Sequence, residues 1–402
     1  MDELKNKITN LEDIKSSYNL KEIFSFLKEN QKLNVIIYNK HLQKRIKIDI
    51  EYYKKKSGKY KIGGKNGIIK VYALNSNELL FEGEYLNGKR NGKGKEYFNN
   101  GKLIFEGEYL NGERHGKGKE YYFNGKLKFE GEYLKGKKWN GKGYNKDEHL
   151  EFELKNGCGL VKDYNYEAEL IFEAEYLNGV KYGKGKEYYF NGNIKYDGEY
   201  INDERHGIGK DYYLNGQLKF EGEYLKGQKW NGKGYNIDNH LEFELKNGCG
   251  KIKEYSFHGI ILFEGEYLNG ERNGKGKEYF ERKVIFEGEY LNGERNGKGK
   301  EYNFYNDNLI FKGEYLNGER NGKGKEYNIV THKLEFEGEY FNGERNGKGK
   351  EYNIVTHKLE FEWEYLNGKK NGKGKEYDCD GKIIFEGEYL NGKKIEKEKI
   401  IN

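Results

Sequence analysis

The residues whose types and spacing come closest to a reactive site lie in residues 83–89, which read G-E-Y-L-N-G-K. This spacing occurs in loops that cradle the phosphates of a nucleotide, where a serine or threonine comes next and binds Mg²⁺. Here Arg90 follows the lysine, and the glycines after it disfavour the helix that such a loop requires. The same motif also recurs in unit after unit. We therefore expect no nucleotide site and no cofactor.

Paired carboxylates are the second candidate for chemistry, because two acidic side chains can act as general acid and base. Glu82 and Glu84 form such a pair, but equivalent pairs repeat throughout the chain, a repetition typical of ion pairing. The eight histidines are scattered, and the three cysteines (Cys158, Cys249 and Cys379) are odd in number. No cysteine or histidine pair has metal-ligand spacing. The sequence predicts a protein that is not an enzyme, with no catalytic residue, no metal and no small-molecule substrate.

These motifs are all parts of one tandem repeat. Aligned on the residue three positions before the glycine of the Asn-Gly pair, fifteen anchors run from Tyr60 to Tyr389 at intervals of 21 to 25 residues. A period of this length marks an array of one supersecondary unit. The repeat is therefore the strongest evidence on the fold.

Each unit has the pattern of a β-hairpin. Residues 81–85 alternate apolar or small residues with charged ones, and residues 92–97 alternate again. Asn87 and Gly88 between them tolerate the positive φ of a tight turn. Several glycines in each unit argue against a helix.

One face of each hairpin is expected to be aromatic. Phe81, Gly83 and Tyr85 share this face, and aromatic rings can lie across the gaps that glycines leave on a sheet. The chain holds 57 Gly, 38 Tyr and 22 Phe, which suits such a layer.

The other face is expected to be ionic. Glu82 and Glu84 lie in one strand and Lys93 and Lys95 in the next, so a ladder of opposite charges should form across the strands. Strict alternation would place Tyr97 on the same side as the lysines, so we expect a bulge near Gly94 to shift the register.

The units resemble MORN repeats (membrane occupation and recognition nexus), and the resemblance covers residues 58–392. It rests on the positions Phe81, Gly83, Tyr85, Asn87, Gly88, Gly92 and Gly94, and on their counterparts in later units. The fold class expected is mainly β: an elongated, single-layer antiparallel β-meander of about fifteen hairpins, on the order of 140 Å long. The resemblance implies a scaffold, spacer or dimerisation surface near membranes or the cytoskeleton, sometimes in contact with anionic phospholipid.

Residues 1–57 differ in kind. Leu20, Ile23, Phe24 and Leu27 follow helical spacing, which predicts a small α-helical cap or module. The run from residue 20 to 27 is similar to the opening helix of F-box-like domains, which would recruit ubiquitin-ligase machinery. Residues 393–402 form a short charged tail.

A basic patch follows these helices. It consists of Lys40, Lys44, Arg45, Lys47, Lys54, Lys55 and Lys56. It is either a solvated face or a contact for anionic lipid headgroups. Residues 59–402 hold nearly equal numbers of basic and acidic residues, which argues against nucleic acid as a partner of the array.

A four-repeat block occurs twice, because residues 133–176 recur at 224–267. The hairpins change length around Trp139 and Cys158 and around their copies, which predicts a bend or extra twist at two places. Trp139, Trp230 and Trp363 are candidate contact residues, since tryptophan is enriched where proteins bind one another. Packing within the longer turn is the alternative for the first two, and Trp363 stands where other units have glycine.

The function that the sequence predicts is a non-catalytic MORN-repeat scaffold for protein–protein interaction or self-association as a homodimer. The alternatives are a peripheral membrane protein that binds anionic phospholipid, and an F-box-like adaptor that recognises partners through its repeats. The first residues lack the layout of a signal peptide, and no apolar run is long enough to span a membrane. We expect a cytoplasmic protein, near a membrane or the cytoskeleton.

Overall fold

The computed structural model describes residues 59–73 and 76–395 of the chain. All thirty regular elements in these residues are β-strands. They fall into two compact units, Met1–Gly183 and Lys184–Asn402, whose boundary lies within β12 (Val180–Tyr188). The predicted helical module, its F-box-like segment and the basic patch lie outside the described residues.

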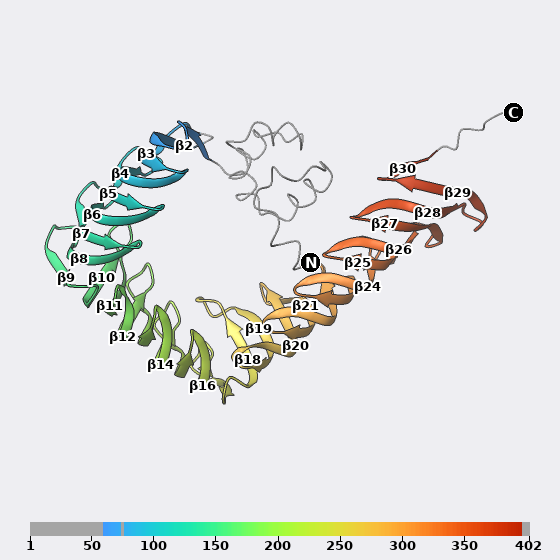
Figure 1. Cartoon of the computed structure of the whole chain (residues 1–402). Helices are drawn as coiled ribbons and strands as arrows, with labels where there is room; N and C mark the ends of the chain where they lie inside the picture. Colours follow the sequence, from blue (N-terminus) through green and yellow to red (C-terminus); the bar gives the residue numbers. More distant parts are fainter. Residues whose placement is uncertain (1–58, 74–75, 396–402) are drawn as a thin grey trace, which may run out of the picture. The chain divides into compact units, whose positions relative to one another are not determined.

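In the first unit, nine strands form one antiparallel sheet in the order of the sequence, and two strands of a second sheet follow (Figure 1). Their bounds are β1 (Lys59–Ile62), β2 (Gly67–Ala73), β3 (Leu79–Leu86), β4 (Lys89–Tyr97), β5 (Leu103–Leu110), β6 (Glu113–Tyr121), β7 (Leu127–Leu134), β8 (Lys137–Tyr144), β9 (Leu150–Leu154), β10 (Gly159–Tyr164) and β11 (Leu170–Leu177).

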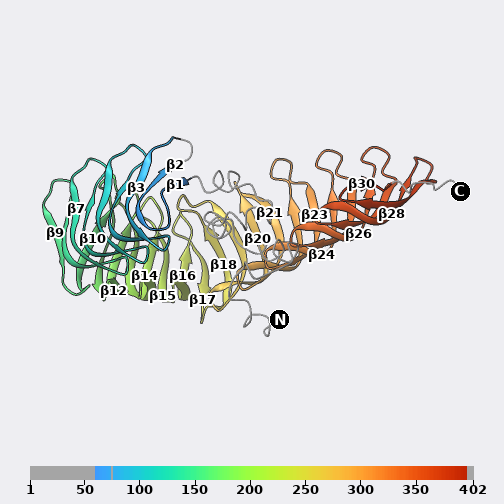
Figure 2. The same cartoon turned by 45° about the horizontal axis from the view of Figure 1, so that its top comes forward.

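The second unit has the same sequential order, and Figure 2 shows its hairpin ends in a row along the sheet from β20 onward. The strands that end the second sheet are β13 (Ile194–Ile201), β14 (Glu204–Tyr212), β15 (Leu218–Leu225), β16 (Gln228–Tyr235) and β17 (Leu241–Leu245). The third sheet contains β18 (Gly250–Tyr255), β19 (Ile261–Leu268), β20 (Glu271–Phe280), β21 (Lys283–Leu291), β22 (Glu294–Tyr302), β23 (Leu309–Leu316), β24 (Glu319–Tyr327), β25 (Leu334–Phe341), β26 (Glu344–Tyr352), β27 (Leu359–Leu366), β28 (Lys369–Tyr377), β29 (Ile383–Leu390) and β30 (Lys393–Lys394).

The hairpins close through the predicted two-residue turn. Leu86 pairs with Lys89, so only Asn87 (φ 51°) and Gly88 (φ 78°) lie between the strands. Two successive residues with positive φ make a turn whose twist matches that of antiparallel strands. The antiparallel meander of hairpins is therefore confirmed in the described residues.

Aromatic rings packed on glycines form the core, as predicted. Phe81 is fully buried and Tyr85 nearly so, and both are on the face toward which a Cβ of Gly83 or Gly94 would point. A Cβ on Gly94 would lie 2.6 Å from Cζ of Phe81, far inside contact distance. The Phe81 ring also meets Tyr109 of the next hairpin edge to face, with ring centroids 5.5 Å apart. Each hairpin is thus tied to its neighbour by aromatic contacts.

Two bulges flank Gly94, near which a bulge was predicted. Gly94 pairs regularly with Gly83, and the register shifts instead between Gly83 and Tyr85 and between Glu96 and Tyr97. At the first shift Gly92 has a φ of 96°, and a Cβ there would lie 2.3 Å from the Glu84 carboxylate. A glycine is therefore required at this bulge, two positions before Gly94.

The strand ladder is interrupted at the two predicted places. Only an isolated bridge, Lys155 with Cys158, lies between β9 and β10 of the first unit, and its copy, Lys246 with Cys249, lies between β17 and β18 of the second. Because these hairpins are shorter, their strands cannot continue the ladder, and three sheets result.

Candidate functional site

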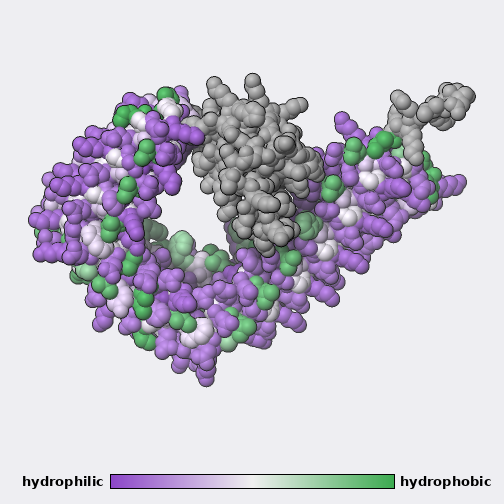
Figure 3. Space-filling model, in the orientation of Figure 1, coloured by the Kyte–Doolittle hydropathy of each residue, from purple (hydrophilic) through white to green (hydrophobic). Residues whose placement is uncertain are grey.

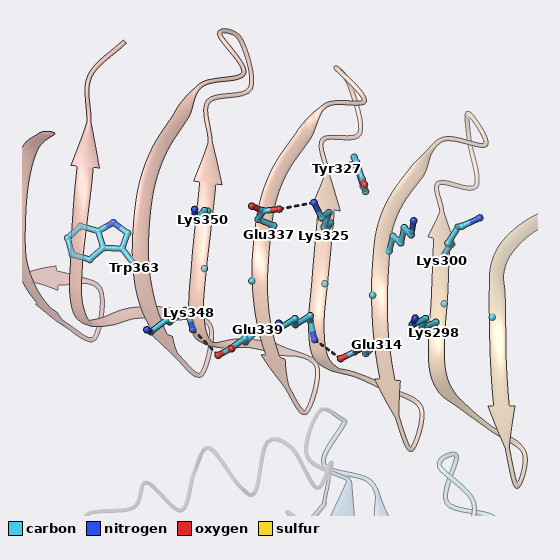
Figure 4. A pocket seen from close by; sticks show the side chains of 18 of the residues that line it. Lys298, Lys300, Glu314, Lys325, Tyr327, Glu337, Glu339, Lys348, Lys350 and Trp363 are labelled. Carbon is cyan, nitrogen blue, oxygen red and sulfur yellow. Dashed lines mark hydrogen bonds and ion pairs between the residues drawn. The ribbon is translucent and has the colours of Figure 1, made fainter. Parts of the chain in front are cut away.

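A groove of about 2080 Å³ crosses the third sheet from β18 to β29, entirely within the second unit. Its residues lie between Lys251 and Ile395, and they recur at the same positions of successive hairpins. Figure 4 shows lysine and glutamate side chains in two rows across the strands. The groove is the candidate functional site.

The floor of the groove is a row of glycines. Gly299 pairs with Gly288 on one side and with Gly313 on the other, and most strands contribute one glycine to this row. Fully buried rings such as Phe286 and Phe311 pack behind the floor. A Cβ on these glycines would point into the rings and not into the groove, so the floor of the groove is formed by backbone.

Two charged rows flank the floor. The first charged row consists of Glu264, Lys277, Glu287, Lys300, Lys312, Lys325, Glu337, Lys350, Glu362, Lys375 and Glu386. The second charged row consists of Lys251, Glu266, Lys275, Glu289, Lys298, Glu314, Lys323, Glu339, Lys348, Glu364, Lys373 and Glu388. The second row alternates in sign throughout, whereas the first alternates except at Lys312.

Carboxylates of the first row accept hydrogen bonds from a lysine and a tyrosine. Glu287 lies 2.7 Å from Nζ of Lys300 and accepts the hydroxyl of Tyr302 at 2.8 Å. These two hydrogen bonds lower the pKa of Glu287. In the same way Lys325 lies 2.8 Å from Glu337 and lowers its pKa. The regular row is therefore a series of satisfied ion pairs.

Carboxylates of the second row accept hydrogen bonds from backbone N–H groups next to the bulges instead. Glu289 accepts the backbone N–H of Lys298 at 3.1 Å, and Glu314 accepts that of Lys323 at 2.9 Å. The ammonium groups of Lys298 and Lys323 form no ion pair with any described residue, and both lysines are exposed. This row presents free cations to the groove.

Lys312 breaks the first row. It is paired directly across the strands with Lys300 on β22 and Lys325 on β24, so three lysines stand side by side. Lys312 is exposed and forms no ion pair within the described residues. The groove therefore has a local excess of positive charge at this point.

A charged network behind the floor holds the aromatic layer in place. Glu301 accepts the hydroxyl of Tyr315 at 2.7 Å and also binds Arg320, whose guanidinium lies 4.0 Å from the centre of the Phe311 ring. Burial by itself would raise the pKa of Glu301, but the hydrogen bond from Arg320 and its charge lower it. The ionised pair and the ring stack make the groove wall rigid.

The three predicted contact tryptophans have different positions. Trp363 is only 2% exposed, and its ring covers Gly374 as phenylalanine rings cover glycines elsewhere. It also lines the groove, so its role as a contact residue stays a prediction. Trp139 and Trp230 are half-buried against Gly157 and Gly248 of the neighbouring shortened hairpins, and not within their own turns as the packing alternative had it. Any contact role of these two stays a prediction.

Sequence reasoning missed Lys312 and Tyr327 of the groove. The signal was present, because residues 311–313 read Phe-Lys-Gly where the other regular units have an acidic residue after the aromatic one. Its meaning depends on the strand register, which brings Lys312 between two further lysines. The predicted residues from Phe81 to Gly94 have structural roles in the first unit, away from this groove.

Comparison with protein families supports the repeat assignment directly. The family model described as MORN repeat matches nine segments, residues 81–102, 105–126, 172–194, 196–216, 263–282, 286–303, 311–328, 336–353 and 364–383. These segments coincide with the hairpins described above. The chain belongs to the MORN-repeat family.

Other comparisons find remote likeness only. A search of curated proteins finds no match. Among solved structures, the chain is similar to TcdB2-TccC3 without its hypervariable C-terminal region (9% identity, TM-score 0.14, covering 80% of this chain and 20% of that one). It is also similar to a protein of unknown function from Bacteroides caccae (8% identity, TM-score 0.14, covering 82% of this chain and 93% of that one). The chain thus spans about one fifth of the length of TcdB2-TccC3.

The described residues offer no other obvious centre. Within residues 59–73 and 76–395, no group of three histidine, cysteine or acidic side chains is placed to hold a metal ion. In that same part of the chain, no helix has the length and apolar character needed to cross a membrane. The groove remains the feature from which a function can be argued.

Proposed function

We propose that this chain is a non-catalytic scaffold that binds an extended segment of a protein partner in the charged groove of its second unit. The observation that carries the proposal is the groove itself, which runs across β18 to β29 with both charged rows along its length. A partner strand lying there would meet paired lysines and glutamates at regular intervals. Such a surface suits a long polar segment better than a small molecule.

The rigidity and polarity of the site support this proposal. The floor is backed by buried rings, and the second row offers ammonium groups such as those of Lys298 and Lys323 that no intramolecular carboxylate occupies. Figure 3 shows a mostly hydrophilic surface with hydrophobic residues in separate spots, so charge rather than apolar area would dominate binding. A preformed site also reduces the entropy lost on association.

A photo-crosslinking experiment tests the proposal. A benzophenone amino acid is introduced in place of Lys298 in the groove, and, as the matched control, in place of Val330, which is 77% exposed on a loop outside the groove. In cells, the groove position should yield a discrete crosslinked protein that the loop position does not. Equal crosslinking at the two positions, or none at Lys298, would contradict the proposal.

A second candidate function is docking on anionic lipid, which the basic patch of residues 40–56 favours. Each basic residue near such a surface contributes about 1 kcal/mol. Vesicles rich in phosphatidylserine should then co-sediment the chain at low salt, and replacing Lys54, Lys55 and Lys56 with glutamine should release it. Binding that survives this replacement would exclude the patch.

Self-association and an adaptor role are also proposals. Light scattering on the purified chain should give twice the mass of 47.3 kDa if it forms a homodimer, and the mass of one chain would exclude the homodimer. A ligase subunit that co-purifies with the chain, and is lost on Leu27→Asp, would support the adaptor. Fluorescence microscopy of the tagged chain tests the cytoplasmic location.

A further inference from the structure

We infer that the lysine cluster at Lys312 is a subsite for a carboxylate side chain, aspartate or glutamate, of the segment bound in the groove. This inference rests on the proposed function and adds the chemistry of one contact. The cluster consists of Lys300, Lys312 and Lys325 together with the hydroxyl of Tyr327.

The charges around Lys312 are not balanced across the strands. Like charges directly opposite each other on neighbouring strands destabilise a sheet, whereas opposite charges stabilise it. Lys312 faces a lysine on both sides, and in the other regular hairpins its position is held by a carboxylate. Lys300 and Lys325 are paired with Glu287 and Glu337, so the charge left without a carboxylate at this point is that of Lys312.

The Tyr327 hydroxyl lacks the carboxylate acceptor that its counterparts have. Tyr302 donates to Glu287, Tyr352 donates to Glu337, and both distances are 2.8 Å. Tyr327 occupies the same place in the hairpin between them, but its counterpart acceptor would be residue 312, which is a lysine. Among the described residues the Tyr327 hydroxyl has no carboxylate acceptor of this kind, and Tyr327 lines the groove.

The two lysines beside Lys312 bind glutamates on opposite strands, away from Lys312. In most hairpins this lysine binds the glutamate of the following strand, as Lys325 binds Glu337 at 2.8 Å. Lys300 has no such glutamate ahead of it and binds Glu287 of the preceding strand instead, at 2.7 Å. Because the two flanking lysines bind carboxylates on their far sides, Lys312 is left between them without a carboxylate. In Figure 4 Tyr327 lies between the strands that carry Lys325 and Lys300.

These donors define the ligand. In the neighbouring hairpins a lysine and a tyrosine together hold one glutamate carboxylate, so the same donor types around residue 312 suit a carboxylate supplied from outside. The groove continues on both sides of this point, which lets the chain that bears the carboxylate extend along the two rows. An acidic protein segment meets both conditions.

The test uses the full-length chain and a fluorescein-labelled octaglutamate peptide, with octaglutamine as the uncharged comparison. Fluorescence anisotropy should show that octaglutamate binds and octaglutamine does not, with affinity falling as salt is added. Lys312→Glu should weaken binding at least about tenfold, because it replaces an attraction with a repulsion. Tyr327→Phe should weaken it about threefold.

Two controls keep the test decisive. Lys312→Glu also restores the charge ladder, so its Tm should equal or exceed that of the wild type, and lost binding cannot then reflect unfolding. Lys382→Glu makes the same charge change at an exposed lysine outside the groove and should leave binding unchanged. An equal loss in both variants would reveal unspecific attraction and overturn the inference.

The outcomes separate this inference from the scaffold proposal. If octaglutamate binds Lys312→Glu as tightly as the wild type, the subsite is refuted, while crosslinking from Lys298 still decides whether the groove binds a protein. If inorganic phosphate or phosphatidylserine vesicles bind in a Lys312-dependent manner and octaglutamate does not, the ligand is another anion and the inference fails.

Discussion

Replacement of one floor glycine tests whether aromatic rings on glycines hold the array together. Gly299 lies on β22, and a Cβ added there would meet Cζ of Phe286 at 2.5 Å and Cε2 of Tyr315 at 3.0 Å. The Phe286 ring cannot move aside freely, because Arg295 covers it at 4.0 Å and Tyr315 packs against it with centroids 5.2 Å apart. Gly299→Ala should therefore destabilise the hairpin.

The magnitude follows from two opposing effects. Overpacking of a closed core costs about 1 to 3 kcal/mol. Replacing glycine with alanine lowers the entropy of the unfolded chain and returns about 0.4 to 1 kcal/mol. The net loss should be about 1 to 2 kcal/mol. A suitable control is Gly293→Ala at the turn, where a Cβ meets nothing within 4 Å and only the φ of 85° opposes the change.

A double-mutant cycle identifies the cause. Phe286→Leu removes the ring atoms that the new Cβ would strike, so Gly299→Ala should cost less in that background, whereas Gly293→Ala should cost the same in both. Urea denaturation followed by circular dichroism gives the total change. Hydrogen exchange of β21 and β22 shows whether the loss is local, as expected in an array.

One result would refute the reasoning. If the costs of Gly299→Ala and Phe286→Leu simply add, the ring does not press on the floor glycine, and aromatic packing is not what requires glycine there.

Three further predictions concern pH, lysine reactivity and turn geometry. Burial alone would raise the pKa of Glu187, but hydrogen bonds from Arg205 and its charge lower it to about 2, below the unfolded value of 4.5. The stability that this pair contributes is present above pH 4.5 and should be lost as the pH falls toward 2. The urea midpoints at pH 6 and pH 3 should therefore differ less in Arg205→Gln than in the wild type. Burial lowers the pKa of Lys219 to about 8, so acetic anhydride at pH 8 should acetylate it faster than its copy Lys128, which lies 3.0 Å from a carboxylate. Equal rates of acetylation of the two lysines, measured by mass spectrometry, would contradict this. Asn292→Ala should cost about 1 kcal/mol because alanine tolerates its φ of 49° poorly, and an unchanged urea midpoint would rule out that strain.

The difference between Lys219 and Lys128 illustrates how the tertiary contacts separate duplicated residues. Lys128 forms an ion pair with Asp163, and the copy of that aspartate is Glu254. Glu254 instead binds the guanidinium of Arg272, with Oε1 2.8 Å from Nε, and the ammonium of Lys219 donates only to a backbone carbonyl. The two copied lysines therefore differ in their partners: Lys128 lies beside a carboxylate, whereas in the described part of the chain the ammonium of Lys219 does not.

The repeat pattern was sufficient to predict the hairpins, their turns and their two faces. Asn87 and Gly88 form the expected turn, and Phe81 packs on glycine as expected, because both features depend on residues within one hairpin and its nearest neighbour. The repeat pattern predicted a bulge near Gly94 but did not identify Gly92 as the residue that must be glycine, since that requirement depends on the Glu84 side chain across the strand. The near-complete burial of Trp363 could not be predicted from the repeat pattern, because it depends on the rings of Phe385 and Tyr389 on β29.

The sequence by itself determined the antiparallel array, since a short period and alternating residue types admit only stacked hairpins. The tertiary structure alone decided where charge is balanced and where it is not. Lys312 is an ordinary lysine in the sequence, and it becomes a candidate anion site because the register places Lys300 and Lys325 directly opposite it. The physical reason is that Coulomb interactions depend on the distance between charges in space, and strand pairing brings together residues that are far apart along the chain.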